Sequence, residues 1–119
     1  MTRLVILDRD GVINFDSKNF IKSPDEWQPI PGSITAIARL HRKGIKVYIA
    51  TNQSGIGRGL LQEKDLQDIH QKMIEVVERA GGKITGIEYC PHHPNVSCPC
   101  RKPKPGMLFA IQESSGLSI

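Results

Sequence analysis

The apolar residues of this chain fall into three short runs, separated by segments whose apolar residues recur at helical spacing. Residues 4–7 are wholly apolar and end at Asp8, which predicts a strand buried on both faces. Two further runs, 45–50 and 84–89, predict a second and a third strand. Because strands alternate with helical segments, the pattern predicts an α/β fold with a parallel sheet flanked by helices.

The helical segments carry recognisable start and stop signals. Ser33 is expected to cap the first helix, which Gly44 should end. Apolar residues recur at helical spacing over 66–80, and the glycine pair that follows should end this second helix. Pro105 is expected to open a last helix.

Residues 14–32 contain three prolines and show little periodicity, which predicts a loop or flap between the first strand and the first helix. Trp27 lies in this segment. The sequence leaves open whether its side chain packs in the core or faces a ligand.

Composition excludes some classes of protein. The 119 residues are 39% hydrophobic and 24% charged, as expected for one globular domain, 1–119. No apolar run reaches the roughly 20 residues that span a bilayer, and the start lacks a signal peptide, so we expect a cytoplasmic protein without a membrane partner. The net charge of +4 is scattered and aromatic residues make up 5%, so we expect no nucleic-acid partner.

All cysteines of the chain lie within residues 90–100, together with two adjacent histidines. Three thiolates and one imidazole form a ligand set that suits tetrahedral zinc. Because all four positions would be filled by protein, such a zinc ion would be structural and would pin the loop 90–100. The alternative is a set of free thiols. Spacing alone does not choose between His92 and His93.

Asp8 and Asp10 stand two residues apart where the first strand ends, so both carboxylates can face one open site. One can attack a phosphate monoester while the other transfers protons. A divalent cation, with magnesium favoured by hard oxygen ligands, would let the anionic groups approach each other. The alternative is a simple turn.

Two further segments suit an anionic ligand. Residues 51–59 place a hydroxyl, two amides and several glycines between a strand and a helix, where backbone N–H groups can hold phosphate oxygens. Arg101, Lys102 and Lys104 follow the cysteine-rich loop and could neutralise a phosphate. A flexible turn and a solvated basic run are the alternatives.

The runs LDRDGVIN, ATNQSGIGRG, and CPHHP with CPCRKPKPGM together resemble the haloacid-dehalogenase phosphatases, in their zinc-carrying subgroup that acts on sugar bisphosphates and histidinol phosphate. The resemblance spans nearly the whole chain. It implies a Rossmann-like sheet of the haloacid-dehalogenase fold that carries a zinc-binding loop.

The resemblance also implies roles for residues at the strand ends. Asp8 would be the nucleophile and Asp10 the general acid/base. Magnesium would be held by the Asp8 carboxylate and the backbone carbonyl of Asp10. Thr51 matches the second family motif, and Asn52 would lie beside it in the substrate pocket.

The same resemblance assigns residues of the second half of the chain. Lys102 matches the lysine of the third family motif, and Arg101 would contact a second phosphate of the substrate. The zinc ligands implied are Cys90, His92, Cys98 and Cys100.

One family feature is expected outside this sequence. The fourth motif, an acidic group that completes the magnesium site, should follow a further strand beyond the last helix, and the sequence ends at Ile119. We therefore expect an incomplete domain. The missing strand would leave an open sheet edge and allow self-association, whereas the full enzyme is expected to be a monomer.

The function implied is magnesium-dependent removal of the 7-phosphate of D-glycero-D-manno-heptose 1,7-bisphosphate through an aspartyl-phosphate, as in the synthesis of heptose for the lipopolysaccharide core. One alternative is hydrolysis of histidinol phosphate. Another is a non-catalytic, zinc-stabilised module that binds a phosphate ligand, although two carboxylates at the site would repel an anion.

Overall fold

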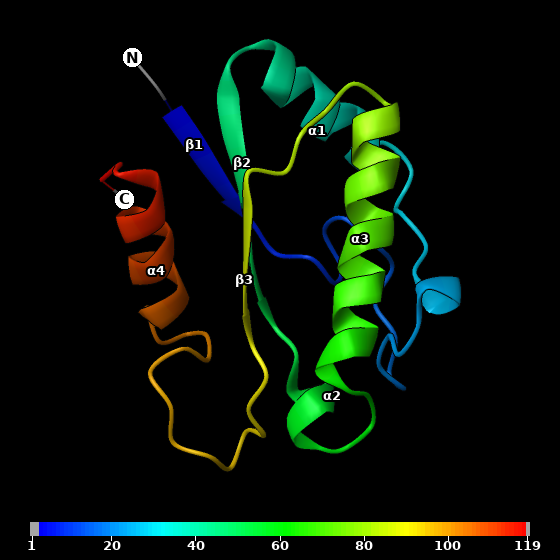
Figure 1. Cartoon of the computed structure of the whole chain (residues 1–119), viewed down its shortest axis with the longest axis vertical. Helices are drawn as coiled ribbons and strands as arrows, with labels where there is room; N and C mark the ends of the chain where they lie inside the picture. The colour runs from blue at the N-terminus through cyan, green and yellow to red at the C-terminus, as the bar shows by residue number, and fades with distance from the viewer. Residues whose placement is uncertain (1–2, 119) are drawn as a thin grey trace.

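The computed structural model describes residues 3–118 and shows alternating strands and helices (Figure 1). The elements in chain order are β1 (Arg3–Leu7), the 3-10 helix η1 (Pro24–Glu26), α1 (Ser33–Arg42), β2 (Ile45–Asn52), α2 (Ser54–Gly57), α3 (Glu63–Arg79), β3 (Gly86–Cys90) and α4 (Gly106–Ser115).

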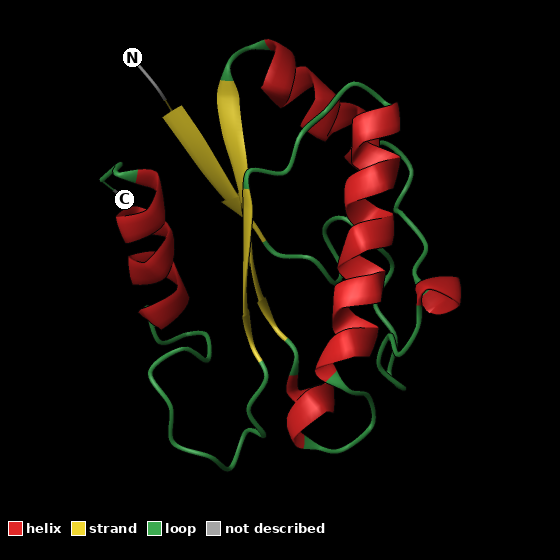
Figure 2. Ribbon diagram, in the orientation of Figure 1, coloured by secondary structure: helices red, strands yellow, loops and turns green. Residues whose placement is uncertain are grey.

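The three strands form one parallel sheet in the order β1-β2-β3. Helices α1 and α3 lie on one side of the sheet and α4 lies on the other (Figures 1 and 2). The chain therefore has the predicted α/β fold, a Rossmann-like parallel sheet flanked by helices. Each predicted strand is present, although β2 runs on to Asn52 and β3 begins at Gly86.

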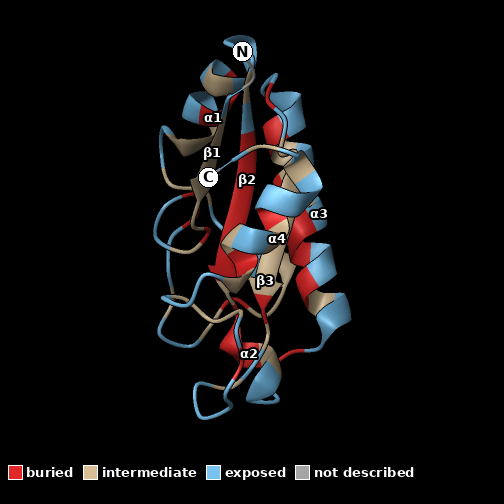
Figure 3. Cartoon of the chain, turned by 90° about the vertical axis from the view of Figure 1, so that its left-hand side faces the viewer, coloured by how far each residue is buried: buried red, intermediate tan, exposed pale blue. Residues whose placement is uncertain are grey.

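Strand β2 is the most deeply buried element because it is the central strand (Figure 3). Its side chains alternate between the two faces of the sheet. Val47 and Ile49 belong to the core shared with α1 and α3, whereas Tyr48 and Ala50 belong to the core under α4. Helix α3 contributes its buried apolar stripe to the larger core, through Leu66, Ile69, Met73 and Val77.

The segment between β1 and α1 is a loop as predicted, apart from the single turn of η1. Trp27 is fully buried in the core shared with α1 and α3. The ammonium group of Lys72 donates a hydrogen bond to the Trp27 carbonyl at 3.2 Å and lies 5.9 Å from the centre of the indole ring. Trp27 is therefore a packing anchor and does not face a ligand.

The prediction that Ser33 caps α1 was wrong. Gly32 occupies the N-cap with a φ of 90°, and Ser33 is the first helical residue. The Ser33 hydroxyl instead lies within hydrogen-bond distance of the carbonyls of Ile13 and Ile30, at 2.7 and 2.8 Å. Its function is to tie the start of the helix to the preceding loop, because a left-handed glycine already sets the turn.

Two observations bear on partners. Within residues 3–118, β1 pairs with β2 alone, so its other edge has no strand beside it; self-association stays a prediction. None of the helices in this part of the chain combines the length and the apolar character that crossing a membrane requires.

Replacing Trp27 with Ala should lower the free energy of unfolding by about 3–5 kcal/mol, because it removes a large, fully buried side chain. Urea denaturation measures this change. The matched control is Phe109→Ala, since Phe109 is 63% exposed and should change stability by about 0.5 kcal/mol or less. Equal effects of the two substitutions would show that Trp27 is not a core residue.

Candidate active site and metal centre

The carboxyl ends of the three strands bring the predicted residues to one edge of the sheet. Asp8 follows β1 directly, while Thr51 and Asn52 end β2. A cavity of about 310 Å³ opens there. It is lined by Asp8, Asp10, Asp16, Ser17, Phe20, Ile21, Thr51, Asn52, Gln53 and Lys102.

Asp8 presents one carboxylate oxygen to the protein and leaves the other available. Its Oδ1 accepts a hydrogen bond from the backbone N–H of Arg9 at 2.8 Å and pairs with the ammonium group of Lys102 at 3.2 Å. Its Oδ2 has no hydrogen-bond or ion-pair partner among the described residues. Since the side chain is 43% exposed, this oxygen can reach a ligand in the cavity.

Asp10 is held through both carboxylate oxygens. Its Oδ1 accepts hydrogen bonds from Arg9 Nε at 2.9 Å and from Asn14 Nδ2 at 3.0 Å, and it lies 2.8 Å from Arg9 Nη2. Its Oδ2 accepts a hydrogen bond from Gln53 Nε2 at 2.9 Å. The carboxyl group of Asp10 therefore has a fixed orientation at the cavity wall.

The end of β2 supplies side chains on both faces of the sheet. Buried Thr51 accepts a hydrogen bond from Gln53 at 2.9 Å. Asn52 pairs with the backbone of Lys102: its Oδ1 accepts from the Lys102 N–H at 3.0 Å, and its Nδ2 donates to the Lys102 carbonyl at 3.3 Å. The Lys102 ammonium also donates to the Ala50 carbonyl at 2.9 Å. These bonds fix Lys102 beside Asp8.

Arg9 is a charged side chain with no exposed surface. Behind it, His70 of α3 places Nε2 at 3.2 Å from Arg9 Nη1. Burial, followed by the positive charge of Arg9, lowers the pKa of His70 to about 4, against the opposing effect of Asp10. His70 is therefore neutral near pH 7, and its Nε2 accepts from the guanidinium, which can only donate.

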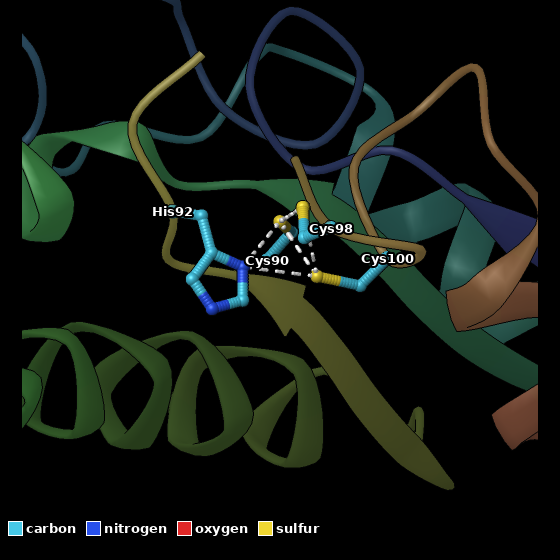
Figure 4. Close-up of side chains that lie close together, drawn as sticks. All are labelled: Cys90, His92, Cys98 and Cys100. Atoms are coloured by element: carbon cyan, nitrogen blue, oxygen red, sulfur yellow. Dashed lines mark hydrogen bonds between the residues drawn. The ribbon is translucent and has the colours of Figure 1, made fainter. Parts of the chain in front are cut away.

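The predicted metal ligands meet in the loop after β3 (Figure 4). The Nδ1 atom of His92 lies 3.5 Å from the Cys90 sulfur and 3.3 Å from the Cys100 sulfur. The Cys98 sulfur lies 3.6 Å from each of the other two sulfurs, which are 2.8 Å apart. Three sulfurs and one nitrogen around a tetrahedral zinc ion would be separated by about 3.5–3.8 Å, so the cluster fits such an ion after Cys90 and Cys100 move apart.

The two adjacent histidines differ in their surroundings. His92 points Nδ1 into the sulfur cluster, whereas the Nδ1 atom of His93 accepts a hydrogen bond from the Asn95 backbone N–H at 3.1 Å. The spacing of the residues did not decide which histidine is the metal ligand. The path of the loop favours His92, because only its Nδ1 faces the sulfur atoms.

Burial and the neighbouring thiols of Cys90 and Cys98 raise the pKa of the Cys100 thiol to about 12. Burial disfavours the charged thiolate, and adjacent sulfurs also repel each other when charged. A cation between them would remove this repulsion.

The loop after β3 packs directly against the end of β2. The backbone N–H groups of Gln53 and Gly57 donate to the carbonyls of Cys90 and Pro91, each at 2.8 Å. A Cβ atom on Gly57 would lie 2.7 Å from the Pro91 carbonyl oxygen. The close approach requires glycine at this position, and it joins the metal centre to the cavity.

Three of the residues that line the cavity are aspartates: Asp8, Asp10 and Asp16. A carboxylate such as that of Asp8 is a hard oxygen ligand, the type that magnesium prefers. The strand end therefore fits the cation that the sequence predicts, with Asp8 and Asp10 as the residues that would hold it.

The structure brings together five of the predicted residues, which are Asp8, Asp10, Thr51, Asn52 and Lys102. Arg101 is not among the residues that line the cavity. It is half-buried, and its Nη1 is buried without a hydrogen-bond partner within residues 3–118. Its assignment as a substrate contact stays a prediction.

Sequence reasoning missed three residues that surround the carboxylates: Arg9, Asn14 and His70. One signal was available for His70, which occurs within the apolar stripe of a helix next to Ile69. Arg9 carried no such signal, because a charged residue at a strand end is expected to be exposed.

Comparison with known proteins identifies the family. The model of the family described as polynucleotide kinase 3 phosphatase matches residues 3–118. The D-glycero-beta-D-manno-heptose-1,7-bisphosphate 7-phosphatase of Pseudomonas aeruginosa is 54% identical over 116 residues, which are 98% of this chain and 65% of the relative. The enzyme of the same name from Neisseria meningitidis is 54% identical over 92% of this chain and 58% of its own length.

Solved structures of similar fold are also phosphatases. The D,D-heptose 1,7-bisphosphate phosphatase of B. bronchiseptica, complexed with magnesium and phosphate, superposes with a TM-score of 0.94 at 50% identity, over 97% of this chain and 64% of that one. A HAD-like phosphatase from Mesorhizobium loti gives a TM-score of 0.85 at 33% identity. The chain spans 58–65% of the length of these curated relatives. From these matches we conclude that the chain belongs to the polynucleotide kinase 3 phosphatase family of the haloacid-dehalogenase superfamily.

Proposed function

We propose that this chain is a magnesium-dependent phosphatase that removes the 7-phosphate of D-glycero-D-manno-heptose 1,7-bisphosphate. The observation that carries the proposal is the geometry of Asp8, which has one oxygen paired with Lys102 and the other open to the cavity. The names of the curated relatives support the substrate. Residues 1–119 act as one domain in this proposal, with the loop 90–100 inside it.

The first chemical step is phosphoryl transfer to Asp8. The free Oδ2 of Asp8 attacks phosphorus and forms an acyl-phosphate bond, while the bond between phosphorus and the sugar oxygen breaks. Asp10 gives its proton to the departing sugar oxygen. The ammonium group of Lys102 and the hydroxyl of Thr51 stabilise the charge on the phosphoryl oxygens.

The second step releases phosphate. Asp10 takes a proton from water, and the water oxygen attacks phosphorus. The acyl-phosphate bond then breaks, which returns Asp8 as a carboxylate and frees inorganic phosphate. Magnesium, held by the Asp8 carboxylate and the Asp10 carbonyl, would neutralise the charge of both phosphate and carboxylate.

The Cys90, His92, Cys98 and Cys100 cluster would hold zinc in a structural role. A zinc ion there leaves no open position for water. Because the loop that it closes begins where Gln53 and Gly57 are bonded and ends two residues before Lys102, the metal would fix the lysine beside Asp8. The cytoplasmic location expected from the sequence stays a prediction.

The direct test of the substrate is phosphate release from heptose 1,7-bisphosphate and from histidinol phosphate, measured side by side with this chain and magnesium. We expect release from the heptose bisphosphate and a kcat/KM for histidinol phosphate at least about tenfold lower. The reverse preference would transfer the assignment to histidinol phosphate. Binding of the sugar phosphate without release of phosphate would favour a non-catalytic module.

Asp8→Asn should lower kcat by at least about a thousandfold, because an amide cannot serve as the nucleophile. Zinc content and the circular dichroism spectrum should not change. Asp68→Asn is the matched control, since Asp68 lies on the exposed face of α3 and, within residues 3–118, pairs only with Lys64, at 3.4 Å; it should retain full activity. Turnover by Asp8→Asn would exclude Asp8 as the nucleophile.

His92→Ala should weaken zinc binding by more than about a hundredfold, since even the loss of a residue behind a ligand costs about 10–100-fold. His93→Ala is the matched control at the adjacent position and should bind zinc normally. Competition with a chromogenic chelator measures both affinities, and the melting temperature should fall only for His92→Ala. A larger effect of the His93 substitution would reverse the ligand assignment.

A further inference from the structure

Arg9 is the one residue between the two aspartates of the site, and it is not among the residues that line the cavity. Its guanidinium is completely buried, although burial of a charge is costly unless each donor has a partner. Each of its three nitrogens has one. Nε bonds to Asp10, Nη2 lies near Asp10 and Gln53, and Nη1 faces His70.

These contacts give the two carboxylate oxygens of Asp10 different roles: Oδ1 anchors the group, and Oδ2 can exchange a proton. Oδ1 receives Arg9 Nε, Arg9 Nη2 and Asn14, so its acceptor capacity is used. Among the described residues, Oδ2 receives a single hydrogen bond, from Gln53. Gln53 completes a closed ring, since its own oxygen accepts from Arg9 Nη2 at 3.3 Å. Oδ2 is thereby the oxygen left to exchange a proton with a ligand.

His70 connects this arrangement to the rigid part of the fold. It projects from α3, whose neighbouring residues Leu66, Ile69 and Met73 have no exposed surface. Because arginine only donates, the ring must accept at Nε2 and carry its proton on Nδ1. The guanidinium is therefore held at Nη1 by His70 of α3, and at Nε and Nη2 by Asp10 and Gln53.

We propose that Arg9, held by His70 and Gln53, is a positioning residue that fixes the carboxyl group of Asp10 for proton transfer to the leaving group. The inference rests on the proposed function, in which Asp10 protonates the departing oxygen. Proton transfer requires placement of the acid within hydrogen-bond reach of that oxygen, and a residue fixed by a second layer of contacts meets this requirement.

A purely structural ion pair would make a different prediction. Loss of a structural contact lowers the stability of the protein and affects all substrates alike. Loss of an oriented acid affects substrates according to their leaving groups, because an alkoxide needs a proton to depart and a nitrophenolate does not. The ratio of kcat/KM for a sugar phosphate to kcat/KM for p-nitrophenyl phosphate therefore separates the two roles, since kcat/KM includes only the steps up to departure of the alcohol.

The test uses substitutions of His70, which does not line the cavity. His70→Leu removes the acceptor for Arg9 and should lower kcat/KM for the heptose bisphosphate by about ten- to a hundredfold. The value for p-nitrophenyl phosphate should fall less than about threefold. His70→Gln restores an acceptor oxygen near the position of Nε2 and should recover both values. Ile69→Val, a buried change on the same helix, calibrates the effect of lost stability and should leave the ratio unchanged.

Two results would overturn the inference: an equal loss for both substrates in His70→Leu, or no loss for either. A second readout is independent of turnover. In nitrogen-15 NMR spectra of the wild-type chain, His70 should show a protonated Nδ1 and the Nε–H of Arg9 should exchange slowly with water; His70→Leu should speed this exchange. A larger loss of kcat/KM for the heptose bisphosphate than for p-nitrophenyl phosphate in His70→Leu supports the inference. A wild-type chain without turnover on either ester would reject the proposed function together with this role of Arg9, whereas turnover with rapid Arg9 exchange would reject the inference alone.

Discussion

The register of the parallel pairing between β1 and β2 determines the geometry of the site. Leu7 lies opposite Ile49, so Asp8 emerges next to the end of β2 and within reach of a lysine whose ammonium is bonded to the Ala50 carbonyl. The pairing of Asn52 with Cys90 places the third strand end at the same edge. A shift of one residue would turn the side chains of β1 to the opposite face of the sheet. The positions of Asp8, of the Lys102 ammonium group and of the loop 90–100 depend on this register.

Two cores support the site from opposite sides of the sheet. The core under α1 and α3 holds His70 and hence the guanidinium behind Asp10, whereas the core under α4 contains Cys90 and Cys98 of the metal loop. Asp10 is thus fixed from one face, and Lys102 is fixed from the other through Asn52. The side chains of Asp10 and Lys102 are therefore anchored in separate parts of the interior.

The local patterns of the sequence were sufficient for the fold and for much of the site. An apolar run that ends in an aspartate predicts a parallel strand with a carboxylate at its open end, and the structure has both. The prediction that this strand is buried on both faces was wrong, because within residues 3–118 β1 is an edge strand and is only half-buried. Thr51 follows in the same way from the second run. Cys90, Cys98 and Cys100 could be grouped because metal ligands in a short loop must lie close together. Resemblance to a family, and not periodicity, supplied the roles of Lys102 and His92.

Other features depended on contacts between distant residues. Arg9 is buried against Gln53 and His70, which lie 44 and 61 residues away in the sequence. A local sequence pattern cannot predict contacts over such separations. The choice of His92 over its neighbour depends on the path of the loop. The cap of α1 was misassigned because a serine before an apolar helix is a common cap, yet here Gly32 makes the turn and Ser33 bonds to the loop.

In the proposed reaction Asp8 accepts the phosphoryl group, and the most direct measurement is to trap that group on the protein. The chain would be mixed with heptose 1,7-bisphosphate and magnesium, quenched in acid during turnover, and digested for mass spectrometry. We expect one phosphoryl group on the peptide that contains Asp8, and hydroxylamine should remove it as it does an acyl-phosphate. Turnover with no phosphorylated peptide, or with the phosphoryl group on another residue, would contradict this role of Asp8.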